Sequence, residues 1–195
     1  VSGRQADHTE SAPTRDQSDD SNTANGTGTP EPVRDTQATP GRDGQLSMLL
    51  RSFDQAMGMA VDQDRLAIGT AFQVWTLWNS RSVAAKLNTS DDFRSEYPYD
   101  ACYMPRSAHV TGAIDVHEMA WGRDDELWLV NTHFSCLCTL GDRFSFVPRW
   151  RPPFVSELAR EDRCHLNGLA MQNGRPKYVT CFGETDSAEG WRAGK

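Results

Sequence analysis

Four polar side chains recur at matching places in the sequence and could together carry chemistry. Asp115 and His117 lie two residues apart, and His165 and Asn167 repeat that spacing 50 residues later. Imidazole nitrogens with carboxylate or amide oxygens suit a divalent metal ion, or a general base beside an electrophile. All four are therefore candidate metal ligands, and His117 and His165 are the candidate catalytic residues. The alternative is a hydrogen-bonded plug that holds no ligand.

Four further polar residues have weaker claims to a function. Glu184 and Asp186 form a close pair of carboxylates after a predicted strand, which makes them secondary candidates for metal oxygens or for an acid and a base. The alternative for this pair is a hydrated turn. His109 lies in a predicted loop and His133 continues a predicted strand, and we interpret both as structural histidines.

The cysteines predict no reactive or metal-binding thiol. Cys136 and Cys138 are too close for a zinc knuckle, which needs two to four intervening residues, so we interpret them as small buried side chains. Cys164 and His165 are neighbours in a predicted strand, where adjacent side chains diverge. Five cysteines spread along the chain do not resemble a secreted disulfide framework, and we expect a cytoplasmic protein.

One proline-rich stretch stands apart from these candidates. Residues 147–154 combine Arg149, Trp150 and Arg151 with three prolines, which predicts a rigid loop that covers one face of the fold or binds an anion. The sequence contains no Gly-rich phosphate loop, no GxSxG and no HExxH motif. It therefore predicts no organic cofactor, and a divalent metal ion is the cofactor we consider.

An internal repeat supplies the elements that position the four candidates. Its copies align at residues 59–60, 119–120 and 169–170, where a large apolar residue precedes Ala. Each copy continues with a polar turn (62–64, 122–126, 172–174) and a strand (66–70, 127–132, 177–182). Each copy therefore predicts a two-stranded hairpin, in which Trp128 and Tyr178 should be large core residues.

The spacing of the copies indicates a β-propeller. Propeller blades take about 40–50 residues and are built from four antiparallel strands. We predict an all-β fold, an incomplete β-propeller of about three blades, with a β-sandwich or meander as the alternative. Because three blades do not close a ring, residues 43–195 should be a fragment of a longer domain with unpaired sheet edges. Equivalent positions in successive blades converge on the axis, so the four candidates should lie close together.

Composition divides the chain and excludes several classes. Residues 1–45 contain four basic and eight acidic groups and no Phe, Trp, Tyr, Leu, Ile or Met, so we expect residues 1–42 to be a disordered tail. The net charge of −7 and the absence of a Lys/Arg cluster argue against a nucleic-acid partner. No apolar run approaches about 18 residues, which argues against a membrane span.

The stretches 99–112, 114–122, 126–137, 144–158, 161–171 and 178–191 together resemble an uncharacterised bacterial family. Its members are conserved hypothetical proteins, or a domain of unknown function of the propeller type, sometimes fused to tetratricopeptide repeats. The members are longer at both ends, so the resemblance implies that this chain holds part of a ring.

Residues 165–180 also resemble, more distantly, the Asn-Gly blade start of the gluconolactonase and senescence-marker propellers. In those propellers the Asn contacts a divalent metal in the central channel. The resemblance therefore implies that Asn167 faces the channel and contacts a metal ion.

Two functions follow as hypotheses. The first is a small-molecule or divalent-metal site in the axial channel, at which a metal ion polarises a carbonyl for hydrolysis or elimination. The second is a non-catalytic module that binds a protein through its blade faces. Fold alone does not choose between them.

Overall fold

Three antiparallel sheets of four, four and two strands make up the structure, a computed structural model that describes residues 52–93 and 98–194. These residues belong to one unit of the chain, which spans residues 52–195. The predicted disorder of residues 1–42 concerns residues outside the described part. The predicted fold class, an all-β and incomplete propeller of about three blades, agrees with these sheets.

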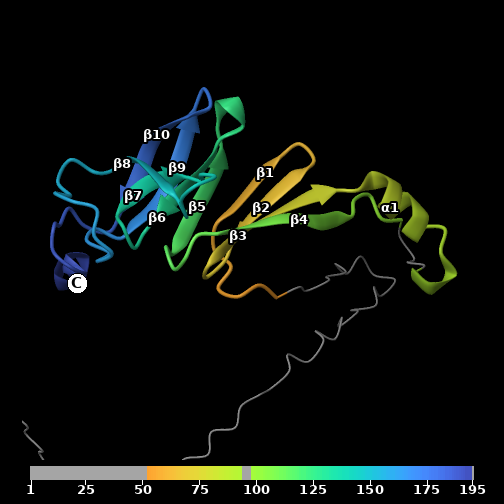
Figure 1. Cartoon of the computed structure of the whole chain (residues 1–195), viewed down its shortest axis with the longest axis horizontal. Helices are drawn as coiled ribbons and strands as arrows, with labels where there is room; N and C mark the ends of the chain where they lie inside the picture. Colours follow the sequence, from red (N-terminus) through yellow and green to blue (C-terminus); the bar gives the residue numbers. More distant parts are fainter. Residues whose placement is uncertain (1–51, 94–97, 195) are drawn as a thin grey trace, which may run out of the picture. The chain divides into compact units, whose positions relative to one another are not determined.

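The first two sheets are meanders in which each strand pairs with the next along the chain (Figure 1). The first sheet contains β1 (Met59–Asp62), β2 (Arg65–Gly69), β3 (Gln73–Asn79) and β4 (Tyr103–Val110). The second contains β5 (Val116–Trp121), β6 (Leu127–Asn131), β7 (Cys136–Thr139) and β8 (Val147–Trp150). The third is the hairpin of β9 (Leu166–Gln172) and β10 (Arg175–Cys181). Helix α1 (Arg81–Leu87) and the short helix η1 (Asp91–Phe93) lie between β3 and β4, η2 (Arg123–Asp125) lies between β5 and β6, and η3 is Gly190–Gly194.

The three predicted hairpins are present as β1–β2, β5–β6 and β9–β10. Their turns contain residues with positive φ, which Asn, Asp and Gly tolerate best: Gln63, Asp124, Asp125, Asn173 and Gly174. The repeat register also holds before each first strand, because the equivalent residues Gln55, Asp115 and His165 all have positive φ.

The first strands of the sheets are the inner ones, because β5 lies beside both β1 and β9. A backbone hydrogen bond from Gly58 N to Val116 O (3.0 Å) joins the first two sheets directly. Apolar side chains fill the space between sheets one and two, with Val74, Val116 and Leu129 almost completely buried. A second cluster, which includes Trp128, Val130 and Leu166, lies between sheets two and three.

In each sheet, the outermost strand contains a β-bulge of the same kind. A proline is followed by a basic residue, and that basic residue is skipped in the pairing with the neighbouring strand. The skipped residues are Arg106 in β4, Arg149 in β8 and Lys177 in β10. The prediction of a loop over residues 147–154 was therefore wrong for its first half, since residues 147–150 pair with β7 as β8.

The prediction that Tyr178 is a core residue was also wrong. Tyr178 lies in β10, the edge strand of a two-stranded sheet, and its side chain is 66% exposed. Trp128 is buried as predicted, since β6 lies inside its sheet and faces the third sheet.

Candidate functional site

The four candidate residues lie at the starts of two neighbouring inner strands. His117 is in β5 and Asn167 is in β9, and Asp115 and His165 come just before these strands. The pairing register shifts at both places: His117 and Glu118 together oppose Val130, and Asn167 is skipped between Leu166 and Gly168. A bulge turns a side chain out of the regular alternation, and bulges are common beside functional sites.

Hydrogen bonds join three of the four side chains. Nδ1 of His117 lies 2.9 Å from Oδ1 of Asn167, and Nε2 lies 3.2 Å from Oδ2 of Asp115. The carboxylate can only accept, so Nε2 of His117 donates. Nδ1 either donates to the amide oxygen of Asn167 or, with the amide in the opposite orientation, accepts a hydrogen bond from the amide nitrogen.

His165 completes the group through its ring and an additional carboxylate. Its ring meets that of His117 edge to face, with centroids 4.8 Å apart. Its Nδ1 donates to Oδ2 of Asp162 at 2.8 Å, and the same oxygen accepts a hydrogen bond from Nε1 of Trp191 at 3.0 Å. The Trp191 ring lies against His165, with centroids 4.2 Å apart. Asp162 therefore fixes both the orientation and the tautomer of His165.

The Asp162–His165 pair leaves one ring nitrogen available. Within the described residues, Nε2 of His165 has no hydrogen-bond partner, and because Nδ1 carries the proton on the Asp162 side, Nε2 of the neutral ring carries the lone pair. The side chain of His165 is 16% exposed and that of Asp115 is 33% exposed, so the group is shielded but not sealed. This arrangement is suited to a general base.

Sequence reasoning missed Asp162, which lies in the loop before β9 and outside the repeat. The available signal was its position three residues before His165, which allows a local contact when the chain turns. Asp162, with a φ of 45°, is itself in a left-handed turn. Its second oxygen, Oδ1, is buried and has no partner in the described part of the chain.

No metal centre is evident in this geometry. Among residues 52–93 and 98–194, no three His, Cys, Asp or Glu side chains are grouped so that they could hold a metal ion. Two of the predicted donor atoms, Nδ1 of His117 and Oδ1 of Asn167, are bonded to each other. A metal ion at these atoms would have to replace that hydrogen bond.

The secondary candidates lie in other surroundings. Asp186 accepts hydrogen bonds from the backbone N–H of Ser156 and from Arg163, both at 2.8 Å. The bond from Ser156, followed by that from Arg163, lowers the pKa of Asp186 below its ordinary value. Arg163 is nearly buried and also pairs with Glu157 and Glu161. Asp186 thus belongs to an ion-pair network, and Glu184 is an exposed residue beside it.

The other histidines and the buried cysteines have structural surroundings. Nε2 of His109 is 2.9 Å from the Ser145 carbonyl, and Nδ1 of His133 is 2.9 Å from the Ala113 carbonyl. Burial raises the pKa of the Cys164 thiol to about 11. The neighbouring Cys136 thiol, followed by burial, raises the pKa of Cys138 well above its ordinary value. Such thiols remain protonated and are poor nucleophiles near neutral pH.

Comparison with known proteins places the chain in a family. Residues 38–195 match the family described as Domain of unknown function (DUF4915). The chain belongs to this family. The predicted relationship to a domain of unknown function is therefore confirmed, and the DUF4915 match includes all four candidate residues and Asp162. No curated protein and no solved structure matches the chain. Within the described part of this DUF4915 domain, no helix is long and apolar enough to cross a membrane.

Proposed function

We propose that this DUF4915 domain is part of a β-propeller that binds a small molecule where the inner strands β5 and β9 begin, and that His165 acts there as a general base. One observation carries the proposal: Asp162 holds Nδ1 of His165 at 2.8 Å, while Nε2 has no partner among the described residues. The adjacency of β1, β5 and β9 supports the propeller assignment, since inner strands of successive blades surround one axis.

The reaction class follows from the groups present. His165 would take a proton from a water or hydroxyl group that attacks a carbonyl carbon, or from a carbon next to a carbonyl in an elimination. Both ring nitrogens of His117 are bonded, to Asp115 and Asn167, so His117 supports the base by holding its ring edge to face against that of His165. The divalent-metal form of the hypothesis requires His117 and Asn167 to separate and bind the ion instead.

Hydrolysis of 4-nitrophenyl acetate by the full chain tests the base. His165→Gln should lower the rate by about 100-fold, the lower end of what a positioned acid or base contributes. Asp162→Asn should lower it as well, because the ring loses the carboxylate that orients it. His109→Gln is the matched control, since His109 bonds a loop carbonyl and should leave the rate unchanged. Urea denaturation of each variant verifies that it is folded.

The outcomes separate the hypotheses. A wild-type rate in folded His165→Gln contradicts the proposed base and favours a module that binds a protein without a reaction. Elemental analysis of the purified protein tests for the metal ion. A stoichiometric divalent ion that is lost in both His117→Ala and Asn167→Ala, together with loss of activity on chelation, would establish the metal-assisted form.

A further inference from the structure

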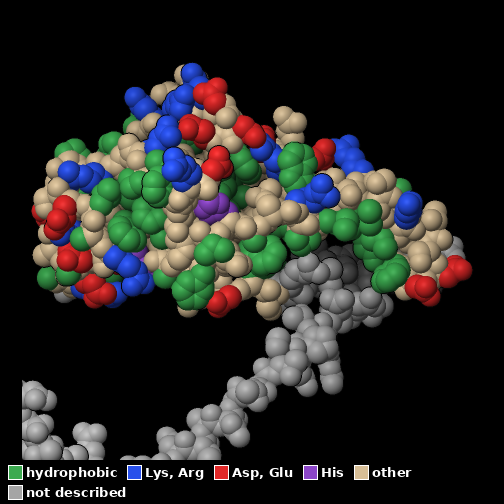
Figure 2. All heavy atoms as spheres, viewed as in Figure 1, with side chains coloured by type: hydrophobic (Ala, Val, Ile, Leu, Met, Phe, Trp, Pro, Cys, Tyr) green, Lys and Arg blue, Asp and Glu red, His purple; other side chains and the backbone are tan. Residues whose placement is uncertain are grey.

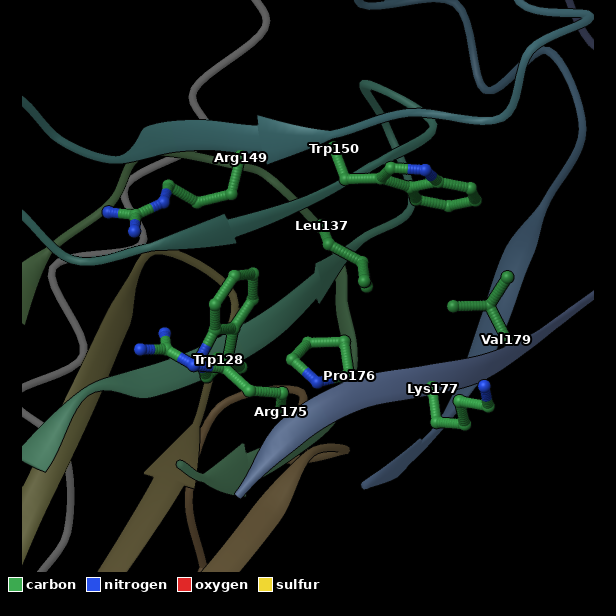
Figure 3. A pocket seen from close by; sticks show the side chains of 8 residues that line it. All are labelled: Trp128, Leu137, Arg149, Trp150, Arg175, Pro176, Lys177 and Val179. Atoms are coloured by element: carbon green, nitrogen blue, oxygen red, sulfur yellow. The ribbon is translucent and has the colours of Figure 1, made fainter. Parts of the chain in front are cut away.

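A second site lies between the outer part of sheet two and the third sheet. A pocket of about 390 Å³ opens there, and it is lined by side chains of β6, β7, β8 and β10 (Figure 3). This volume is within the range of small-molecule sites, which runs from about 300 to 1,000 Å³. None of the residues of the His165 group lines it.

The pocket has an apolar part and a basic part. Its apolar surface comes from Trp128, Leu137, Trp150, Pro176 and Val179. The charged residues that line it are all basic, namely Arg149, Arg175 and Lys177. In Figure 3 the guanidinium groups of both arginines lie at one end, near Trp128, whereas Trp150, Val179 and the amine of Lys177 lie toward the other end. An occupant that fits both parts has an apolar body and a charged group.

Backbone geometry explains why two of the cations are there. Arg149 and Lys177 are the residues skipped at the Pro–basic bulges of β8 and β10, and these two strands face each other across the pocket. A bulge re-aims the side chain that it carries. The first sheet repeats the combination on its own, where Pro105 and Arg106 of β4 line a smaller hollow with Trp78.

The net charge of the residues around the pocket indicates which ligand charge it could accommodate. Glu126 bridges the two arginines, with Oε1 3.2 Å from Arg149 and Oε2 3.1 Å from Arg175, and Asp124 lies 3.0 Å from Arg175. Figure 2 shows basic and acidic side chains gathered over the tips of the β5–β6 and β9–β10 hairpins. No ion pair of Lys177 is present among the described residues. Three cations against two carboxylates leave one positive charge, which matches a monoanion.

We propose that this pocket binds a small organic monoanion, with its apolar body against Trp150 and Val179 and its anionic group on Lys177. This inference goes beyond the proposed function, because the two sites share no residue and either can be present without the other.

Binding of 2-naphthoate to the full chain, followed by quenching of tryptophan fluorescence and by calorimetry, tests the proposal. Wild-type protein should bind it saturably, and the affinity should fall as salt is added. The neutral analogue 2-naphthamide has the same apolar body and should bind about tenfold more weakly, since one charge-assisted hydrogen bond is lost. Lys177→Met keeps the apolar stem of the side chain and should weaken 2-naphthoate binding by about the same factor.

Two controls fix the location. Lys86→Met, on the exposed surface of α1, should bind like the wild type, and Trp150→Ala should lose binding of both compounds. Amide spectra of each variant verify its fold, and the indole N–H signals of Trp128 and Trp150 should shift on binding. Equal affinities for naphthoate and naphthamide, unchanged binding by folded Lys177→Met, or no saturation at millimolar concentration would each overturn the proposal.

Discussion

The space between sheets one and two differs in kind from the space between sheets two and three. The first contains closely packed apolar side chains, and glycine backbone meets Val116 directly: a Cβ built on Gly58 would lie 2.9 Å from Val116 Cγ1. The second also has a buried apolar centre, but it carries the His117–Asn167 hydrogen bond at one place and the basic pocket at another.

This difference shows how one backbone frame serves two purposes. Gln55 and Met57 occupy the places of Asp115 and His117 in the first sheet, with the same positive φ at Gln55 as at Asp115. Yet Met57 is 52% exposed, and no histidine lies there. The backbone conformation before each inner strand determines where the side chain lies, whereas the residue type determines whether that side chain could bind or react with a ligand. The candidate functional side chains are therefore concentrated between sheets two and three.

Of the substitutions that distinguish the two interfaces, Arg163→Met should lower the free energy of unfolding most. Arg163 joins the loop that carries Asp162 to the loop before Trp191, through Glu157, Glu161 and Asp186 at 2.8 Å each. Its side chain is only 8% exposed. The substitution should lower the free energy of unfolding by about 2–3 kcal/mol, because charge-assisted hydrogen bonds of a buried cation are lost while the carboxylates remain hydrated.

Urea denaturation measures this loss. Arg192→Met is the control, since its ion pair with Glu189 is more than half exposed and should contribute less than about 1 kcal/mol. An equal effect of the two substitutions would show that the network does not hold the third sheet.

A pH effect of intermediate size should come from Cys164. Its pKa is raised to about 11 in the folded protein, so the folded state retains the thiol proton that the unfolded state releases at its ordinary, lower pKa. The contribution to stability is complete below the unfolded pKa and is lost as the pH rises toward the folded pKa. We expect a loss of about 1.4 kcal/mol at pH 10, which is the value of one pKa unit.

Comparison of unfolding free energies at pH 8 and pH 10 checks this effect, with Cys164→Ala as the reference variant. Cys164→Ala should be less stable at pH 8 because it leaves a cavity, but its stability should fall less between the two pH values. The same fall in both proteins would assign the pH dependence to other groups, among them Cys138 in the first interface.

The smallest expected change in stability comes from alanine substitutions at Gly58 and Gly168, which occupy equivalent positions of the repeat. Gly58→Ala should cost about 1 kcal/mol, because the new Cβ meets buried Val116 and Met119. In Gly168→Ala the Cβ meets only the hydroxyl of the exposed Thr180, which can rotate away, so the cost should stay below about 0.5 kcal/mol. Thermal unfolding of both variants gives the difference. Gly58→Ala with Val116→Ala should recover part of the clash cost, and a harmless Gly58→Ala would mean that this interface is loosely packed.

Local patterns predicted the hairpins well, for a physical reason. The Asn173–Gly174 turn and the apolar residues beside it act within a few residues, so sequence alone specifies them. The predicted proximity of Asp115, His117, His165 and Asn167 followed from the repeat register, and their hydrogen bonds and ring contacts bring these side chains together. Their metal-binding and catalytic roles stay predictions.

Features that depend on a distant partner could not be predicted. A bulge is a relation between two strands, so the Pro–basic bulges at Arg106, Arg149 and Lys177 appear only when the pairing is known. The contact of Asp162 with His165 requires the turn that brings them together. Tyr178 is a large aromatic residue of the kind that often fills a core. Whether such a side chain is buried depends on what covers its strand, and Tyr178 is exposed because β10 is an edge strand.

The Pro–basic bulges have a further consequence for how the protein behaves in solution. An exposed edge strand is a template on which a second chain can add its own strand, and repetition of that step leads to fibrils. In β4, β8 and β10 the proline removes a backbone donor, the bulge interrupts the ladder, and the basic residue brings a charge. Each of these three strands is therefore a poor template for the addition of another chain's strand.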